Sequence, residues 1–181
     1  MKNIKYLFIT GTIVFSAMFG SASANESFFD WLIDFSRHKG VAPTANEAYE
    51  EECGACHFPY QPGLLPKQSW NKLFEPKQLS DHFGDNAELD EKLRAEFNKY
   101  VTENSADNSW YKRSRKIMAS LEENQYPIRI TEIPYIKNKH KDISVKLIRD
   151  NKKVGSLSYC DKCHRSASKG IYDDDTVLIP Q

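Results

Sequence analysis

One short pattern occurs twice in this chain and constrains its fold more than any other feature. Two cysteines separated by two residues are followed at once by a histidine, in residues 53–57 (CGACH) and in residues 160–164 (CDKCH). This is the attachment signature of c-type haem, because thiols about one helical turn apart add to the two vinyl groups of one porphyrin. The following histidine is the proximal iron ligand. The sequence therefore predicts two covalently bound haem c groups, attached through Cys53, Cys56, Cys160 and Cys163 and ligated by His57 and His164.

A structural zinc site built from two CxxC pairs is the alternative interpretation of the cysteines. Zinc would account for all four thiols but not for a histidine directly after both pairs. Histidine makes up only 5 of the 181 residues, so coincidence explains the repeated pattern poorly. Covalent haem is the prediction, and it leaves no cysteine for a disulfide or a reactive thiol.

The N-terminus has the three parts of a secretory signal peptide. Lys2 and Lys5 form a basic region, residues 6–19 are apolar, and Ala22-Ser23-Ala24 fits a cleavage site. An uncleaved membrane anchor is the alternative, but the apolar stretch is shorter than the roughly 20 residues that a membrane span needs. We therefore expect residues 1–24 to be a cleaved signal peptide. The mature protein is expected to be periplasmic and not an integral membrane protein.

The remaining chain divides at a polar stretch, residues 104–108, into two halves of opposite charge. Residues 25–109 contain 16 acidic and 8 basic residues, a net charge of −8, whereas residues 110–181 contain 9 acidic and 15 basic residues, a net charge of +6. Each half holds one motif, which predicts an N-terminal and a C-terminal c-type haem domain with these bounds. Because domains of this size bury little surface by themselves, we expect the porphyrins to supply the missing apolar centres. The apoprotein is therefore not expected to fold stably.

Regular secondary structure is predicted to be helical and limited. Helical periodicity is strongest over residues 88–104, where Asp85 and Glu88 resemble a capping pair at the start. A shorter helix over residues 45–53 delivers the first motif at its end. Residues 128–133 alternate between apolar and polar side chains, as an extended segment does. The pattern favours a mainly α fold with extensive irregular structure.

The ligand on the far side of each iron decides what such a protein does. An open iron binds gases or peroxide, whereas an iron with two protein ligands is suited to electron transfer. Two irons need two distal ligands, and the chain beyond residues 1–24 contains only one methionine. Histidine must therefore serve at least one iron, unless a site is open or filled by lysine. We predict that His82 is the ligand opposite His57 and that His140 is the ligand opposite His164, although solvent-exposed histidines remain the alternative. Beyond the motifs and residues 1–24, the chain also contains His38, whose role stays open, and Met118, which is more typical of a helix core.

The order of these features resembles one known family, the dihaem cytochromes c associated with the sphaeroides haem protein. The resemblance covers nearly the whole mature chain and rests on residues 52–57, 62–66 with Trp70, 81–84 with Asn86 and Leu89, 129–132, His140 and 160–165. It implies a periplasmic electron carrier with two bis-histidine haems. It also implies a class I cytochrome c-like N-terminal domain and a C-terminal domain that is low in regular structure.

We therefore predict an electron-transfer protein rather than an enzyme, with His57, His82, His140 and His164 as iron ligands. A haem-based gas or redox sensor and a small dihaem peroxidase are the alternatives, because each needs one open iron. The resemblance implies two redox partners, an oxygen-binding monohaem cytochrome c and a membrane-bound cytochrome b. No nucleic-acid partner is expected.

A basic cluster surrounds His140 in the sequence. If His140 binds iron, these side chains lie around the edge of the second haem and would steer an acidic partner toward it. The alternative is that they only keep a poorly cored domain soluble. The cluster has a local net charge of +5 after two aspartates are subtracted, and its basic members are Lys137, Lys139, Lys141, Lys146, Arg149, Lys152 and Lys153.

Overall fold

The computed structural model describes residues 39–181, which belong to one compact unit, Arg37–Gln181. The predicted signal peptide at residues 1–24 and the unassigned His38 lie outside the described residues. Helices and connecting segments make up the described part, which contains no β-strand; a single isolated antiparallel bridge joins His82 to Asp85. The prediction of a mainly helical protein is confirmed for this part of the chain.

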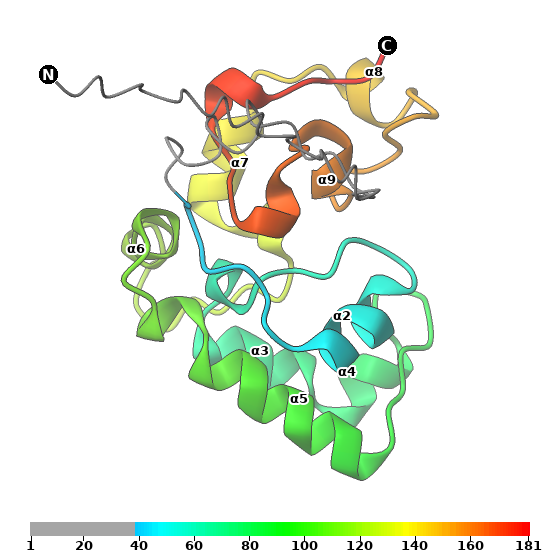
Figure 1. Cartoon of the computed structure of the whole chain (residues 1–181), viewed down its shortest axis with the longest axis vertical. Coiled ribbons are helices and arrows are strands. Elements are labelled where there is room, and N and C mark those ends of the chain that lie inside the picture. The colour runs from blue at the N-terminus through cyan, green and yellow to red at the C-terminus, as the bar shows by residue number, and fades with distance from the viewer. Residues whose placement is uncertain (1–38) are drawn as a thin grey trace, which may run out of the picture. The chain divides into compact units, whose positions relative to one another are not determined.

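The helices fall into two groups along the chain (Figure 1). In Figure 1, α2 to α5 lie together in cyan and green, and α7 to α9 lie together in yellow and orange. The first group and its 3-10 turns are α2 (Glu47–Gly54), η1 (Pro62–Leu64), α3 (Lys67–Leu73), α4 (Pro76–Ser80), α5 (Glu91–Glu103) and η2 (Ala106–Asn108). The rest are α6 (Lys112–Ala119), η3 (Ile130–Glu132), α7 (Pro134–His140), α8 (Val145–Ile148), α9 (Cys160–Cys163), η4 (Ala167–Lys169) and η5 (Asp174–Thr176).

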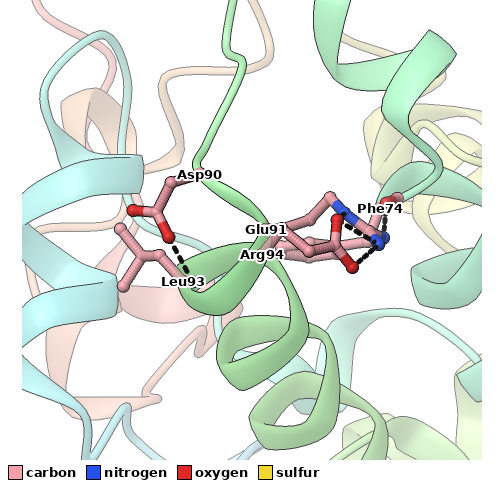
Figure 2. A network of polar contacts seen from close by, with 5 residues as sticks. All are labelled: Phe74, Asp90, Glu91, Leu93 and Arg94. Atoms are coloured by element: carbon pink, nitrogen blue, oxygen red, sulfur yellow. Dashed lines mark hydrogen bonds and ion pairs between the residues drawn. The ribbon is translucent and has the colours of Figure 1, made fainter.

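The longest helix, α5, begins later than the periodicity predicts, and the predicted capping pair of Asp85 and Glu88 is wrong. The N-cap is Asp90, whose carboxylate accepts a hydrogen bond from the backbone N–H of Leu93 at 3.0 Å (Figure 2). Upstream, the side-chain oxygen of Asn86 accepts from the N–H of Glu88 at 2.9 Å. Such a local side-chain bond offers the backbone an alternative to the helix, so the first turn starts only after it.

Packing of α5 against α3 forms the base of the first group. Phe97 and Val101 of α5 are fully buried and share a hydrophobic cluster with Trp70 of α3. At the surface, Arg94 pairs with Glu91 and donates a hydrogen bond to a backbone carbonyl at the end of α3 (Figure 2). Solvent screens an exposed ion pair, which therefore contributes little, whereas burying one large side chain contributes about 1.5–3 kcal/mol. Apolar burial therefore dominates this contact.

Two further predictions about local structure have opposite outcomes. The helix that delivers the first motif is confirmed as α2, which Asn46 caps by accepting from the N–H of Tyr49. The extended segment predicted over residues 128–133 is wrong, because η3 turns there. Ile130 and Ile133 are both buried, and residues three apart lie on one side of a 3-10 turn but on opposite faces of a strand. Tertiary burial therefore overrides the alternating pattern.

Side chains from both halves of the chain share one buried cluster. It includes Trp70 and Phe97 from the first half and Ile117, Ile133 and Tyr172 from the second. A buried glutamine links the two halves with hydrogen bonds: Gln61 donates to the carbonyl oxygen of Ala167 and accepts from the hydroxyl of Tyr172 at 2.6 Å. Whether residues 25–109 and 110–181 are separate domains stays a prediction.

A close backbone contact joins the start of the described chain to its end. The N–H of Gly40 donates to the carbonyl oxygen of Gly170 at 2.8 Å. Gly170 has φ of +75°, and a Cβ there would lie 2.2 Å from the carbonyl oxygen of Val41. Both facts require glycine at this position. The contact places the segment before α2 against the loop that follows the second motif.

Candidate functional site

The first motif lies at the end of α2. Cys53 is in its last turn and partly buried, whereas Cys56 is exposed in the following turn. Beneath them Tyr49 is buried, and its hydroxyl donates to the carbonyl oxygen of Tyr60 at 2.8 Å. His57 follows the turn, with its Nδ1 at 2.8 Å from the carbonyl oxygen of Phe58. That hydrogen bond fits a tautomer with the proton on Nδ1, which leaves Nε2 free to bind a metal.

The structure brings His82 opposite His57. The two rings are nearly parallel, at 18°, and their centres are 6.2 Å apart. His82 sits in a tight loop between α4 and α5, where its N–H donates to the carbonyl oxygen of Asp85 at 2.7 Å. The next two residues, Phe83 and Gly84, both have positive φ, at 63° and 107°. The backbone that carries the imidazole of His82 is therefore held in a tight, hydrogen-bonded turn.

The second motif has the same arrangement on different elements. Cys160 and Cys163 are the two ends of the short helix α9, and His164 follows at once. His140, the last residue of α7, faces His164 with ring centres 6.1 Å apart. The planes of these two rings differ by 76°, in contrast to the first pair. The Nδ1 of His140 lies 2.8 Å from the carbonyl oxygen of Ile136, so its Nε2 is also free to bind a metal.

Both ring separations fit an iron held between two imidazoles. First-row metal ions bind histidine nitrogen at about 2 Å, and a ring centre lies roughly 1.2 Å beyond that nitrogen, so two collinear imidazoles have centres about 6.4 Å apart. The observed values are 6.2 and 6.1 Å. The Nδ1 atoms of His82 and His164 are buried and have no hydrogen-bond partner among the described residues. Two facing imidazole pairs, one at each motif, are thus the site that these residues form.

A large cavity adjoins the second pair. Its volume is about 880 Å³, within the roughly 300–1,000 Å³ range of cofactor and ligand pockets. Both cysteines and both histidines of the second site line it, together with apolar side chains such as Ile136 and Val154. A porphyrin is a large apolar ring, so the chemistry of the lining fits one. Tyr60, from the first half of the chain, also lines this cavity.

Burial sets the protonation of two candidate ligands, His164 and His82. It lowers the pKa of His164 to about 4, with further contributions from His140 and Arg113. Burial, followed by the nearby His57, also lowers the pKa of His82. Both rings are therefore neutral near pH 7, and a neutral imidazole is the form that binds a metal.

The zinc alternative can be compared with the geometry around the cysteines. Burial raises the pKa of both Cys53 and Cys160 to about 12, so without a bound metal these thiols are protonated. Within residues 39–181, no three His, Cys, Asp or Glu side chains are grouped so that they could hold a metal ion. The zinc alternative therefore has no geometric support in the part of the chain that the structure describes.

Sequence reasoning missed several residues that support the two sites. The ring of Tyr60 stacks on that of His57 with centres 4.9 Å apart, and its hydroxyl donates to the carbonyl oxygen of Ser158 at 2.7 Å. The guanidinium group of Arg129 lies over the ring of Phe83, which is beside His82. No periodicity or spacing marks these residues, because their partners are distant in sequence. Met118, by contrast, packs against the core, as predicted for a residue of that type.

No helix among residues 39–181 is long and apolar enough to cross a membrane. Residues 49–172 match the model of a family described as dihaem cytochrome c. A search of curated proteins finds no match.

Solved structures are similar to this chain. The new diheme cytochrome type c from Shewanella baltica is 38% identical, with a TM-score of 0.60, and the match covers 75% of this chain and 93% of that one. The diheme cytochrome c from Rhodobacter sphaeroides is 34% identical, with a TM-score of 0.63, and the match covers 73% of this chain and 100% of that one. The crystal structure of DHC purified from the same organism is 32% identical, with a TM-score of 0.56, and the match covers 72% of this chain and 99% of that one.

Proposed function

The chain belongs to the dihaem cytochrome c family, and from this premise we propose that it is a periplasmic electron carrier with two six-coordinate bis-histidine haems. Members of this family are generally electron-transfer proteins with two covalently attached haem c groups. The observation that carries the proposal is the pair of facing imidazoles at each motif, 6.2 and 6.1 Å apart. In the proposal, residues 1–24 direct export, the first half of the mature chain is a class I-like domain, and the second half is low in regular structure.

Each residue of the two sites has a definite role in this proposal. Cys53 and Cys56 attach the first haem, and Cys160 and Cys163 attach the second. When bound, each haem supplies a single iron that cycles between the ferric and ferrous states. His57 with His82 would hold the first iron, and His140 with His164 would hold the second. With two protein ligands each, neither iron would offer a site for substrate in either oxidation state.

The first prediction tests closed coordination at both irons. Carbon monoxide added to the dithionite-reduced protein is expected to leave the Soret band unchanged, because it finds no vacant position on either iron.

In the oxidised protein, low-temperature EPR should show two different low-spin signals. Nearly parallel imidazole planes, at 18°, make the two iron d orbitals that accept ligand π density unequal and give a rhombic signal. Nearly perpendicular planes, at 76°, make these orbitals similar and give a more anisotropic signal with a larger highest g value.

A different outcome would point to another class of protein. A Soret shift with carbon monoxide, or a high-spin ferric signal, would show an open iron. That result would contradict the carrier proposal and favour a gas sensor or a peroxidase. Denaturing electrophoresis with haem staining is the control, because both covalent haems must be present before coordination is judged.

We also propose that an acidic redox partner docks on the basic cluster around His140. The cavity mouth includes Lys137, Lys139 and Lys141, which are exposed. Lys139 already pairs with Asp174, so Lys137 and Lys141 are the better positions for charge reversal. Candidate partners are the oxygen-binding monohaem cytochrome c and the membrane-bound cytochrome b that the resemblance implies. A cationic surface at the second site would steer such a partner to the place where electrons leave the protein.

The second prediction tests docking. Reversing both charges, as K137E with K141E, is expected to slow electron transfer to the oxygen-binding monohaem cytochrome c on the order of tenfold at low salt, because steering is lost. Stopped-flow absorbance measures the rate, which should also fall in wild type as salt rises. K92E is the matched control, since Lys92 is an exposed lysine of α5 that does not line the cavity. Equal rates for wild type and the double variant at every salt concentration would leave solubility as the role of the cluster.

A further inference from the structure

The loop that carries His82 has an unusual backbone at its tip. Phe83 has φ of 63°, a conformation that residues other than glycine seldom adopt, and its ring is 40% exposed. Gly84, at φ of 107°, completes the turn, and its N–H donates to the side chain of Asp81 at 3.1 Å. The ring of Phe83 therefore stands at the surface directly beside the imidazole, with ring centres 4.7 Å apart.

An arginine from the second half of the chain covers this ring. The guanidinium carbon of Arg129 lies 3.8 Å from the centre of the Phe83 ring, well inside the roughly 6 Å limit for a cation–π contact. Arg129 occupies the position just before the turn η3, which is held in the core by Ile130 and Ile133. The core of the molecule thus fixes a cation over an aromatic ring, and that ring lies beside the imidazole of His82 at a tilt of 56°.

Carboxylates near Arg129 and Phe83 oppose this positive charge, among them the Asp81 side chain that holds the loop. Glu132 lies 3.8 Å from Nε of Arg129, and both side chains are about half exposed, so solvent screens this pair. Asp85 hydrogen-bonds to His82 through the backbone, and its carboxylate opposes Arg129, whose effect on the pKa of His82 is the larger of the two. Arginine is always charged in proteins, so its charge does not depend on pH. A permanent positive charge therefore lies next to one axial side of the first site.

We propose that Arg129 is a positioning residue for the first haem, whose fixed positive charge raises the reduction potential of that haem. This inference rests on the proposed function, in which His82 binds the first iron. A ferric site carries one more positive charge than a ferrous one, so a nearby cation disfavours the oxidised state. The net charge of −8 over residues 25–109 acts in the opposite direction. The second half of the chain thereby supplies the local cation that the acidic half lacks.

The third prediction concerns the potential of each haem separately. An EPR-monitored redox titration of the intact holoprotein follows the two low-spin signals independently. In R129Q, the ferrous-to-ferric ratio of the first haem at a fixed potential is expected to fall on the order of tenfold, which corresponds to about 59 mV for one electron. R129K should keep most of the wild-type potential, because it keeps the charge. E132Q should shift the same step in the opposite direction, because it removes a counter-charge.

Controls separate this effect from a general one. R115Q removes another exposed arginine from the second half, in α6, and should leave both steps unchanged. The step of the second haem should stay in place in every variant. An unmoved first step in R129Q, or an R129K shift as large as that of R129Q, would overturn the inference. Failure of the proposed function would look different, because wild type itself would then show a high-spin ferric signal.

Discussion

Replacing His82 with alanine is expected to open the first haem and to leave the second haem closed. The imidazole of His82 faces that of His57 at 6.2 Å, and no other described imidazole contacts His57 in the structure. Without it the first iron loses one of its two nitrogen ligands. We expect the rhombic low-spin EPR signal to disappear completely, a high-spin signal to replace it, and one carbon monoxide to bind per reduced protein. Wild type is expected to bind none.

The companion variant H140A should give the mirror result. It is expected to remove the more anisotropic signal, because His140 faces His164 at 76°. Added imidazole should restore a low-spin iron in both variants, since it supplies the missing nitrogen ligand. If H82A instead removed the signal of the perpendicular pair, the ligands would be crossed between the haems. The assignment of His82 to the first haem would then be wrong.

Removing the second haem is expected to abolish cooperative folding. The cavity at the second site has a volume of about 880 Å³. At about 24 cal/mol per Å³ of unfilled cavity, leaving one third of this volume empty costs about 7 kcal/mol. The free energy of unfolding of a typical domain is only about 5–15 kcal/mol. The double variant C160A with C163A should therefore lose most of its stability.

Circular dichroism during heating checks this prediction. The variant without the second haem should show no sharp unfolding transition, whereas wild type should show one. The single variant C160A is the matched control, because it keeps Cys163 and His164 and so retains one thioether and both axial ligands. Loss of the second haem should also weaken the first half, since Tyr172 and Ile133 belong to the shared cluster. A holo-like transition in the double variant would contradict the view that the porphyrin completes this core.

Local rules predicted those parts of the fold that depend on neighbouring residues. Helix α2 was predictable from its composition, and its cap Asn46 lies directly before it. The long helix was predictable from its apolar face, but its start was not, because the side chain of Asn86 holds the N–H of Glu88 outside the helix and Asp90 is the cap. Residues 128–133 were predicted wrongly for a different reason. Their alternation is a local signal, and the core overrode it by burying both Ile130 and Ile133.

By itself the sequence determined the chemistry of attachment, since two thiols and a histidine act within five neighbouring residues. It also limited the possible distal ligands, because few histidines remain outside the motifs. It predicted the pairing of His82 with His57 and of His140 with His164 from their places in the two halves, but only the tertiary structure gave the distances and angles at which these rings meet. Only the tertiary structure placed Arg129 against Phe83. Such contacts join residues that are far apart in the chain, and they depend on how the whole core packs rather than on any local pattern.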